Sequence, residues 1–280
     1  MRSYGTAEPV GSVKTRLGEG PRWDAAAGRL LWVDIDAGVL RAGDRTVECG
    51  AKVGAAAAVS DGEVLVALAD ALAIVDLADS SVRRVADVPH ARPGMRSNDG
   101  ACDPLGRFWI GTTADDPIPG AAALYRYDGV RLDTVLSGLT LSNGLGWHGE
   151  RMLFVDSPTQ RVDVLDFDRV SGAVANRRPF AEVPEEDGTP DGLAIDDEGG
   201  VWVALYGGGE VRRFDAAGAV TGRVEVPAEH PTACCFAGSR LFVTSASKDA
   251  DDDDPHAGRL YALDVPFSGP PAQRFRPAAA

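Results

Sequence analysis

Four segments of the chain carry an oxygen-bearing side chain at the same distance from a later polar residue. These side chains are Glu19, Asn98, Asn143 and Asp191, and each stands five residues before an Asp or a His, with Gly one or two places behind it. An apolar run with an aromatic residue follows in every case. If the repeats are arranged radially, the four side chains converge on one axis. Converging carboxylate and amide oxygens are the ligands that a hard divalent cation binds.

Each of these residues also has an ordinary structural interpretation. Asn-Gly and Asp-Gly are strong turn formers, and the Glu19 carboxylate could be satisfied by backbone amides of its own turn. A purely structural turn would favour one residue type in every repeat, yet two further repeats carry Ala56 and Thr232. The shared register therefore favours a metal site. Its two carboxylates and one or two amides suit Ca²⁺, Mg²⁺ or Mn²⁺, and Zn²⁺ only loosely.

Short strands in a repeated pattern position these residues. Pairs of apolar runs, bounded by Gly, Asp and Pro, recur at intervals of roughly 35 to 50 residues. The first runs are residues 30–35, 64–68, 108–112, 152–156, 201–205 and 241–245, and the second runs are residues 39–42, 73–77, 123–128, 162–167, 210–214 and 259–264. This period is typical of a four-stranded propeller blade. The sequence predicts an all-β, six-bladed β-propeller with an axial metal site.

Composition and charge restrict the classes of protein and of partner. All 280 residues are expected to form one domain, residues 1–280, with a frayed Pro- and Ala-rich tail from residue 269. The net charge of −14 argues against nucleic acid and against anionic membranes as partners. The N-terminus has no apolar targeting segment and no stretch is long and apolar enough to span a membrane, so we expect a cytoplasmic protein. The oligomeric state is not determined by the sequence.

Two common hydrolase motifs do not occur in the sequence. The chain contains neither Gly-x-Ser-x-Gly nor His-Glu-x-x-His, and its four histidines show no ligand spacing. The cysteines, Cys49, Cys102, Cys234 and Cys235, are expected to be reduced, and small core-filling side chains suit their positions better than ligands or nucleophiles do.

Nine short segments give the chain a resemblance to a known family. They are residues 18–23 (GEGPRW), 96–100 (RSNDG) with 103–108 (DPLGRF), 111–113 (GTT), 141–144 (LSNG), 154–157 (FVDS), 190–192 (PDG) with 201–206 (VWVALY), and 231–236 (PTACCF). In this order and over nearly the whole chain, the sequence resembles the SMP-30/gluconolactonase/LRE-like family, which includes regucalcin and bacterial sugar lactonases. The resemblance implies a six-bladed propeller with one catalytic divalent metal in the axial channel.

The family's roles carry over to individual residues of this chain. By resemblance, the metal ligands fall on Glu19, Asn143 and Asp191, and the substrate contacts fall on Arg96, Asn98 and Asp116. Asp116 stands where regucalcin has Glu, so it is one methylene shorter. The implied substrate is a small-molecule sugar lactone and the implied cofactor is one divalent cation, Ca²⁺ first, with Zn²⁺, Mn²⁺ or Mg²⁺ as alternatives.

Metal-assisted hydrolysis of an aldonolactone is the expected reaction, which makes the chain a gluconolactonase-like carboxylic ester hydrolase. Asp191 is the expected general base for the attacking water. Two alternatives stay open: a related propeller hydrolase that acts on aryl esters, larger lactones or phosphotriesters, and a non-enzymatic scaffold or calcium-binding propeller. A repeated Trp-Asp motif would favour a scaffold, but Trp23-Asp24 occurs only once.

Overall fold

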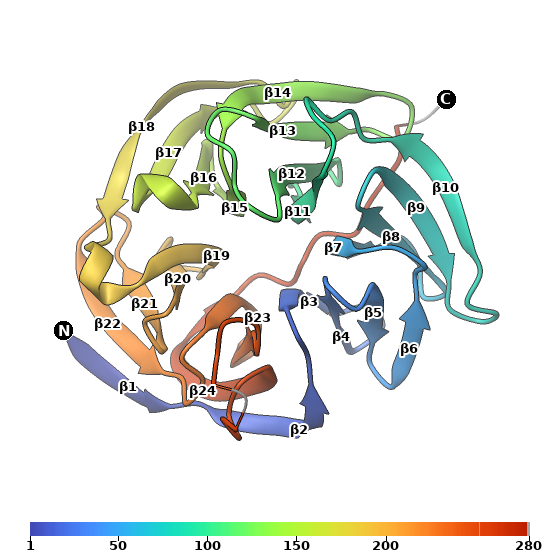
Figure 1. Cartoon of the computed structure of the whole chain (residues 1–280). Helices are drawn as coiled ribbons and strands as arrows, with labels where there is room; N and C mark the ends of the chain where they lie inside the picture. Colours follow the sequence, from blue (N-terminus) through green and yellow to red (C-terminus); the bar gives the residue numbers. More distant parts are fainter. Residues whose placement is uncertain (252, 279–280) are drawn as a thin grey trace.

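Six small sheets surround a central axis in this computed structural model, which describes residues 1–251 and 253–278 (Figure 1). The first four blades are β3–β6 (Gly18–Asp24, Arg29–Asp34, Val39–Ala42, Arg45–Glu48), β7–β10 (Val53–Ala58, Glu63–Leu68, Ala71–Asp76, Val82–Asp87), β11–β14 (Met95–Cys102, Phe108–Ala114, Ala122–Tyr127, Leu132–Leu139) and β15–β18 (Ser142–His148, Arg151–Asp156, Arg161–Phe167, Val174–Glu182). The fifth contains β19–β22 (Thr189–Ile195, Val201–Tyr206, Glu210–Phe214, Val220–Glu225), and the sixth contains β23 (Pro231–Ser245) and β24 (Arg259–Gly269). The predicted all-β, six-bladed propeller is confirmed.

The N-terminal residues join the end of the ring to its beginning. β2 (Glu8–Lys14) pairs antiparallel with β24 in the sixth blade, and β1 (Arg2–Thr6) pairs parallel with β22 in the fifth. β23 supplies two adjacent segments of the sixth blade, since the Thr232 hydroxyl donates to Thr244 Oγ1 at 2.9 Å. The sixth blade is therefore built from both ends of the chain.

The first strand of each blade lies nearest the axis. These strands contact one another around the ring, from β3 through β7, β11, β15 and β19 to β23, which in turn contacts β3. Because the blades repeat by rotation, their first strands run in the same direction along the axis. The order of residues along each first strand is therefore also their order from one mouth of the channel to the other.

The five-residue spacing shared by the repeats joins a residue that faces the axis to a later residue with a structural role. Asp103 and Asp196 end their segments as buried turn carboxylates, and each accepts a hydrogen bond from a buried indole, Trp109 Nε1 at 2.9 Å and Trp202 Nε1 at 2.8 Å. Asp196 also pairs with Arg213 Nε at 2.8 Å. These carboxylates hold the turn into the second strand, while the residue five places earlier is free to face the axis.

One blade lacks a side chain at the axial position. The strand register places Gly54, rather than the expected Ala56, at the position that Glu19 occupies in the first blade. A Cβ on Gly54 would overlap the backbone of Ser97 and Asn98 in the next blade. The blades pack too closely at this point for any side chain.

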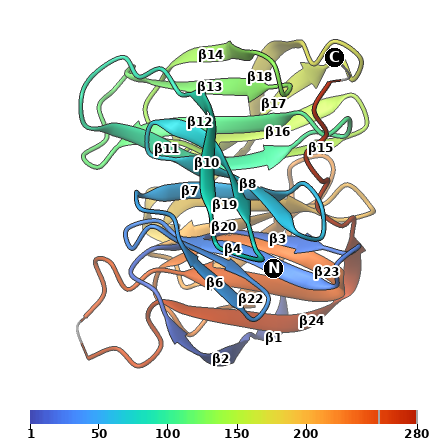
Figure 2. The same cartoon turned by 90° about the vertical axis from the view of Figure 1, so that its right-hand side faces the viewer.

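The C-terminal tail is ordered along residues 270–278, so the expectation of fraying is wrong there; residues 279–280 lie outside the described part. Arg274 binds both oxygens of Asp24, with N–O distances of 2.8 and 3.0 Å, and buried Phe275 stacks on Tyr127 at 5.6 Å. The tail, dark red in Figure 1, crosses the centre of the ring. It lies on the face opposite the loop between β23 and β24 (Figure 2). The Pro- and Ala-rich composition suggested a frayed tail because it gives no sign of the contacts that Arg274 and Phe275 make.

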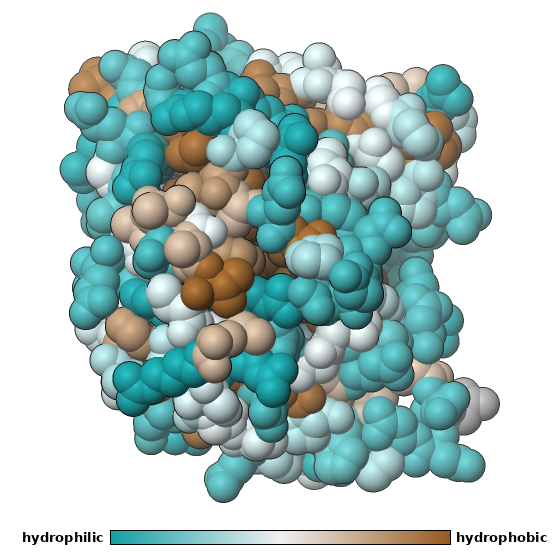
Figure 3. Space-filling model, turned by 90° about the vertical axis from the view of Figure 1, so that its left-hand side faces the viewer, coloured by the Kyte–Doolittle hydropathy of each residue, from teal (hydrophilic) through white to brown (hydrophobic). Residues whose placement is uncertain are grey.

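The outer rim is largely hydrophilic. Figure 3, which faces the side of the molecule with β18 and β22, shows polar residues around one group of apolar ones. Large apolar side chains that are exposed are few among the described residues: Met1, Leu105, Val130, Val170 and Val220. In the same part of the chain, no helix has the length and apolar character that crossing a membrane requires.

Asp196→Ala should destabilise the fold strongly. The substitution leaves the Trp202 indole N–H and the Arg213 guanidinium buried without their acceptor. We expect the free energy of unfolding, measured in urea, to fall by about 3 kcal/mol. The matched control is exposed Asp44→Ala, for which a change within about 0.5 kcal/mol is expected. Equal effects of the two substitutions would contradict the structural role of Asp196.

Candidate metal centre

Four of the predicted site residues meet where the first strands begin. Glu19 lies on β3, Asn98 on β11, Asn143 on β15 and Asp191 on β19, and each is at most 7% exposed. Each stands at or next to a β-bulge, where the strand departs from regular pairing with the second strand of its blade. A bulge re-aims side chains that would otherwise alternate between the two faces of a blade.

A chain of hydrogen bonds fixes the amide side chains. Arg96 Nη1 donates to Asn98 Oδ1 at 2.7 Å, and Asn98 Nδ2 donates to Asn143 Oδ1 at 2.6 Å. Asn143 Nδ2 then donates to Ser157 Oγ at 2.8 Å, and the Ser157 hydroxyl donates to the carbonyl of Pro190 at 2.7 Å. This chain sets the orientation of both amides. Asn143 Oδ1 keeps one lone pair for another partner.

Three carboxyl groups share the same buried space. Burial, followed by the charge of Asp99, raises the pKa of Glu19 to about 8. Burial and the charges of Glu19 and Asp99 raise the pKa of Asp191 well above its usual range. Asp99 itself has its pKa raised by burial, although Arg22 Nη2, 3.1 Å from Asp99 Oδ1, opposes the shift. The positive charge that the protein places around this cluster is therefore too small to keep all three carboxyl groups ionised at their usual pKa values.

The donor set fits a divalent cation. Within the part of the chain that the structure describes, Asp191 Oδ1 is buried and has no hydrogen-bond partner, and Glu19 Oε2 accepts only the Gly20 N–H at 3.0 Å. Among residues 1–251 and 253–278, no three His, Cys, Asp or Glu side chains are placed to hold a metal by themselves. The Asn143 Oδ1 amide oxygen, which Asn98 Nδ2 contacts at 2.6 Å, is a further oxygen donor in the same cluster. Carboxylate and amide oxygens suit a hard cation, which would also relieve the repulsion between Glu19 and Asp191.

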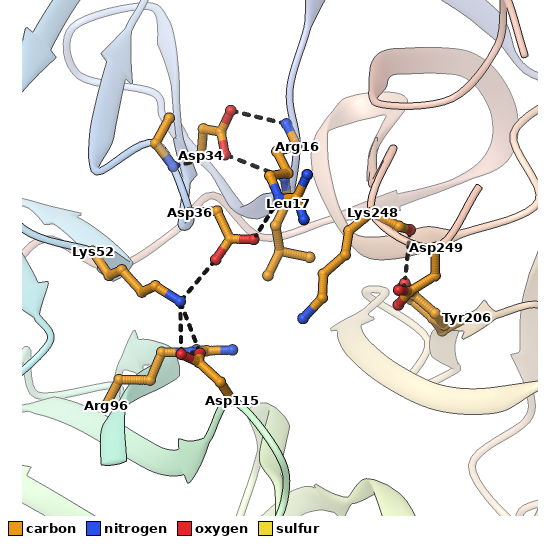
Figure 4. Close-up of polar contacts among 11 residues, drawn as sticks. Arg16, Leu17, Asp34, Asp36, Lys52, Arg96, Asp115, Tyr206, Lys248 and Asp249 are labelled. Carbon is orange, nitrogen blue, oxygen red and sulfur yellow. Dashed lines mark hydrogen bonds and ion pairs between the residues drawn. The ribbon is translucent and has the colours of Figure 1, made fainter. Parts of the chain in front are cut away.

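The mouth of the site is polar (Figure 4). Arg96 links it to the buried cluster through its hydrogen bond to Asn98. Arg96 Nε lies 3.0 Å from Asp115 Oδ1, and Lys52 Nζ lies 2.9 Å from the same oxygen and 3.1 Å from Asp36 Oδ1. The predicted substrate contact Asp116 is exposed, and no hydrogen bond or ion pair joins it to the described residues of this cluster. The structure thus brings Asp115, not Asp116, to Arg96.

A second side of the mouth was not predicted. Tyr206 donates from its hydroxyl to Asp249 Oδ2 at 3.0 Å (Figure 4). Its ring stacks on His230, with the ring centroids 4.4 Å apart. Burial, followed by the hydrogen bond with Asp249 and the charges of Asp249, Asp191 and Glu19, raises the pKa of Tyr206. Tyr206 is the last residue of β20, and its place at the end of an apolar strand was the only signal in the sequence.

Comparison with known proteins supports a lactonase relationship. The SMP-30/Gluconolactonase/LRE-like region matches residues 17–247. A putative sugar lactone lactonase of Bacillus subtilis is 35% identical, over 90% of this chain and 95% of its own. An L-arabinolactonase of Azospirillum brasilense is also 35% identical, over 97% of this chain and 96% of its own. These relatives span the complete propeller.

A solved structure shows the same arrangement of blades. Regucalcin of Agrobacterium tumefaciens, described as a calcium-binding protein, superposes with a TM-score of 0.92 and 29% identity. The superposition covers 99% of each chain.

The stability of the metal-free protein should fall as the pH rises. Between about pH 4.5 and pH 8 the folded protein retains a proton on Glu19 that the unfolded chain has lost, so the free energy of unfolding decreases across this window. Urea unfolding in EDTA at several pH values measures the slope. Glu19→Gln should make it shallower, because one titrating group is gone, and Ca²⁺ should make the wild-type slope shallower too. A slope in Glu19→Gln equal to that of the exposed control Glu8→Gln would contradict the prediction.

Proposed function

The chain belongs to the SMP-30/Gluconolactonase/LRE-like family, and on this premise we propose that it hydrolyses sugar lactones to the corresponding acids with the aid of one divalent cation. The observation that best supports the proposal is the unpartnered Asp191 Oδ1, buried beside Glu19 at the axis. A buried carboxylate oxygen without a partner is costly unless a ligand completes it. The names of the lactonase relatives supply the substrate class.

Glu19, Asn143 and Asp191 would hold the cation. Ca²⁺ is the first candidate because all three donors are oxygens, with Mg²⁺, Mn²⁺ and Zn²⁺ as alternatives. When bound, the cation would supply Lewis acidity toward the lactone carbonyl. The hydrogen bonds from Asn98 to Asn143 and from Asn143 to Ser157 keep the amide oriented before any ligand arrives.

Asp191 would move the proton. Hydrolysis forms a bond between the water oxygen and the carbonyl carbon and breaks the bond from that carbon to the ring oxygen. Asp191 would take the proton released by the water and return it to the departing ring oxygen. Its raised pKa suits this exchange, although contact with a cation lowers that pKa. A water held at the cation would be the alternative base.

Arg96 and Asn98 would orient the sugar. Arg96 is held by Asp115 through Nε and by Asn98 through Nη1, so its remaining Nη2 is available for a substrate hydroxyl. Asp116 remains a proposed substrate contact, which it would make from the exposed loop after β12. Several polar donors and acceptors at the mouth suit a polyhydroxylated ring better than an aryl ester. Gluconolactone as the particular substrate, and a cytoplasmic location, stay predictions.

Release of acid from lactones tests the function directly. A pH indicator follows glucono-δ-lactone, an arabinonolactone and an aryl acetate, each with EDTA and with Ca²⁺, Mg²⁺, Mn²⁺ or Zn²⁺. We expect turnover of the sugar lactones to require a cation and the aryl acetate to react poorly. Glu19→Gln should raise the cation concentration needed for half-maximal activity. Full activity in protein shown by elemental analysis to be metal-free would contradict the mechanism, and cation binding without turnover of any ester would favour a calcium-binding propeller.

Asp191→Asn separates proton transfer from cation binding. The amide keeps an oxygen for the cation but removes the base, so kcat should fall about 10²- to 10⁴-fold and stay low at saturating cation. The measurement is kcat across a cation titration, with Glu19→Gln as the matched ligand variant that saturation should rescue. Recovery of Asp191→Asn to within a few-fold of wild type would assign Asp191 to binding alone.

A further inference from the structure

One chain of ion pairs joins three blades at the mouth of the channel (Figure 4). Asp36, in the connection between β4 and β5 of the first blade, lies 3.2 Å from Arg16 Nε through Oδ2 and 3.1 Å from Lys52 Nζ through Oδ1. Lys52 directly precedes β7 of the second blade. It also binds Asp115, which follows β12 of the third blade, and Asp115 in turn binds Arg96. Lys52 therefore links Arg96 to the first blade.

Lys52 supplies positive charge to two carboxylates at once. Its ammonium nitrogen lies 2.9 Å from each oxygen of Asp115 as well as 3.1 Å from Asp36 Oδ1. Burial opposes the ionisation of both aspartates. The hydrogen bonds from Lys52, joined at Asp115 by one from Arg96, outweigh burial and lower the pKa of each carboxyl group below its usual value. Both aspartates are therefore charged at neutral pH and hold Lys52 between them.

The position of the Asp115 side chain depends on Lys52. Asp115 lies on the loop after β12 with its side chain 56% exposed, whereas the side chain of Arg96 is 9% exposed. Within residues 1–251 and 253–278, its carboxylate has Lys52 and Arg96 as hydrogen-bond partners. An exposed carboxylate gains little from a single cation, and a network of several charges holds it better. Lys52 thus fixes this loop, which also carries Asp116, the other proposed substrate contact.

Arg96 meets the chain of ion pairs at one edge of its guanidinium group. Nε donates to Asp115 Oδ1 at 3.0 Å, while Nη1 donates to Asn98 Oδ1 at 2.7 Å and to the carbonyl of Ser97 at 3.0 Å. Two fixed edges set the plane of this rigid group, and with it the direction in which Nη2 points. Loss of the Asp115 contact would free one edge but leave Asn98 bonded. The amides of the proposed cation site would therefore keep their orientation.

We propose that Lys52 is a positioning residue for the substrate, a role that rests on the proposed lactonase function. By holding Asp115, Lys52 sets the direction in which Arg96 donates to the hydroxyl groups of the sugar. These hydroxyl groups lie away from the bond that breaks, so their hydrogen bonds contribute equally to the bound substrate and to the transition state. Loss of Lys52 therefore weakens binding of the sugar lactone and leaves both kcat and the affinity for the cation nearly unchanged.

Gluconolactam, the hydrolysis-resistant analogue of glucono-δ-lactone, tests the proposal without turnover. Isothermal titration calorimetry with saturating Ca²⁺ compares wild type with Lys52→Met, which keeps the chain length without the charge, and with Lys52→Arg, which keeps the charge. We expect Kd to rise about tenfold in Lys52→Met and to stay within about threefold of wild type in Lys52→Arg. The matched control Lys14→Met removes an exposed ammonium that donates to the carbonyl of Asp254, and it should leave Kd unchanged.

Kinetics and a double variant separate positioning from a structural role. In Lys52→Met, KM for glucono-δ-lactone should rise about tenfold, while kcat stays within about twofold of wild type and Kd for Ca²⁺ does not change. Asp115→Ala should have the same effect. The double variant should lose no more than either single variant, because both substitutions break one contact. If Lys52→Met fails to fold, Lys52→Gln takes its place.

A gluconolactam Kd in Lys52→Met within about twofold of wild type would overturn the proposal. So would losses that multiply in the double variant, a loss of Ca²⁺ affinity in Lys52→Met, or wild type that binds no gluconolactam. Failure of the proposed function has a different signature. Wild type that binds the lactam with this dependence on Lys52, but hydrolyses no lactone, would support the positioning role and contradict the lactonase activity.

Discussion

Repulsion among buried carboxylates is the constraint on which the centre of this propeller depends. Glu19, Asp99 and Asp191 are each at least nine-tenths buried, and within residues 1–251 and 253–278 only Asp99 of the three has a direct cationic partner, Arg22. In the metal-free protein, burial and mutual repulsion raise the pKa of Glu19 and of Asp191 and so favour their protonated forms. The cluster persists because six blades and the closing strand β2 fix the first strands around it. The fold thus holds together charges that would separate in a flexible chain.

Because the first strands all run in the same direction, the order of residues along each strand is also their order along the channel. The side chains of the proposed metal site come first, small and apolar residues follow, and the turn carboxylates Asp103 and Asp196 stand at the far end in buried hydrogen bonds with indoles. The C-terminal tail then covers that end. One short segment, used repeatedly, therefore builds a polar site, an apolar stretch of the channel and a structural turn. The polar site lies at the mouth that the tail leaves uncovered.

The repeat made the fold and the convergence of Glu19, Asn98, Asn143 and Asp191 predictable from the sequence, because equivalent positions in a radial array must converge. Their role as ligands stays a prediction. Asn98, next to Arg96, was found by the same register. Residues outside the register were missed: Ser157 follows β16 in a 3-10 turn, and Asp115 lies in the loop after β12. The conformation of this loop decides whether Asp115 or Asp116 reaches Arg96, and no local sequence pattern predicts that conformation. The tail was misread because Arg274 and Phe275 find partners that lie far away in the sequence.

Proton release on cation binding tests the central claim most directly. Isothermal titration calorimetry of Ca²⁺ into EDTA-stripped, dialysed protein, repeated at pH 7 in buffers of different ionisation enthalpy, counts the protons displaced. The carboxylate cluster predicts release of about one proton per cation from Glu19, declining toward pH 9 as Glu19 ionises without the cation. Tight binding with no proton release at pH 7, or release unchanged in Glu19→Gln, would contradict the account.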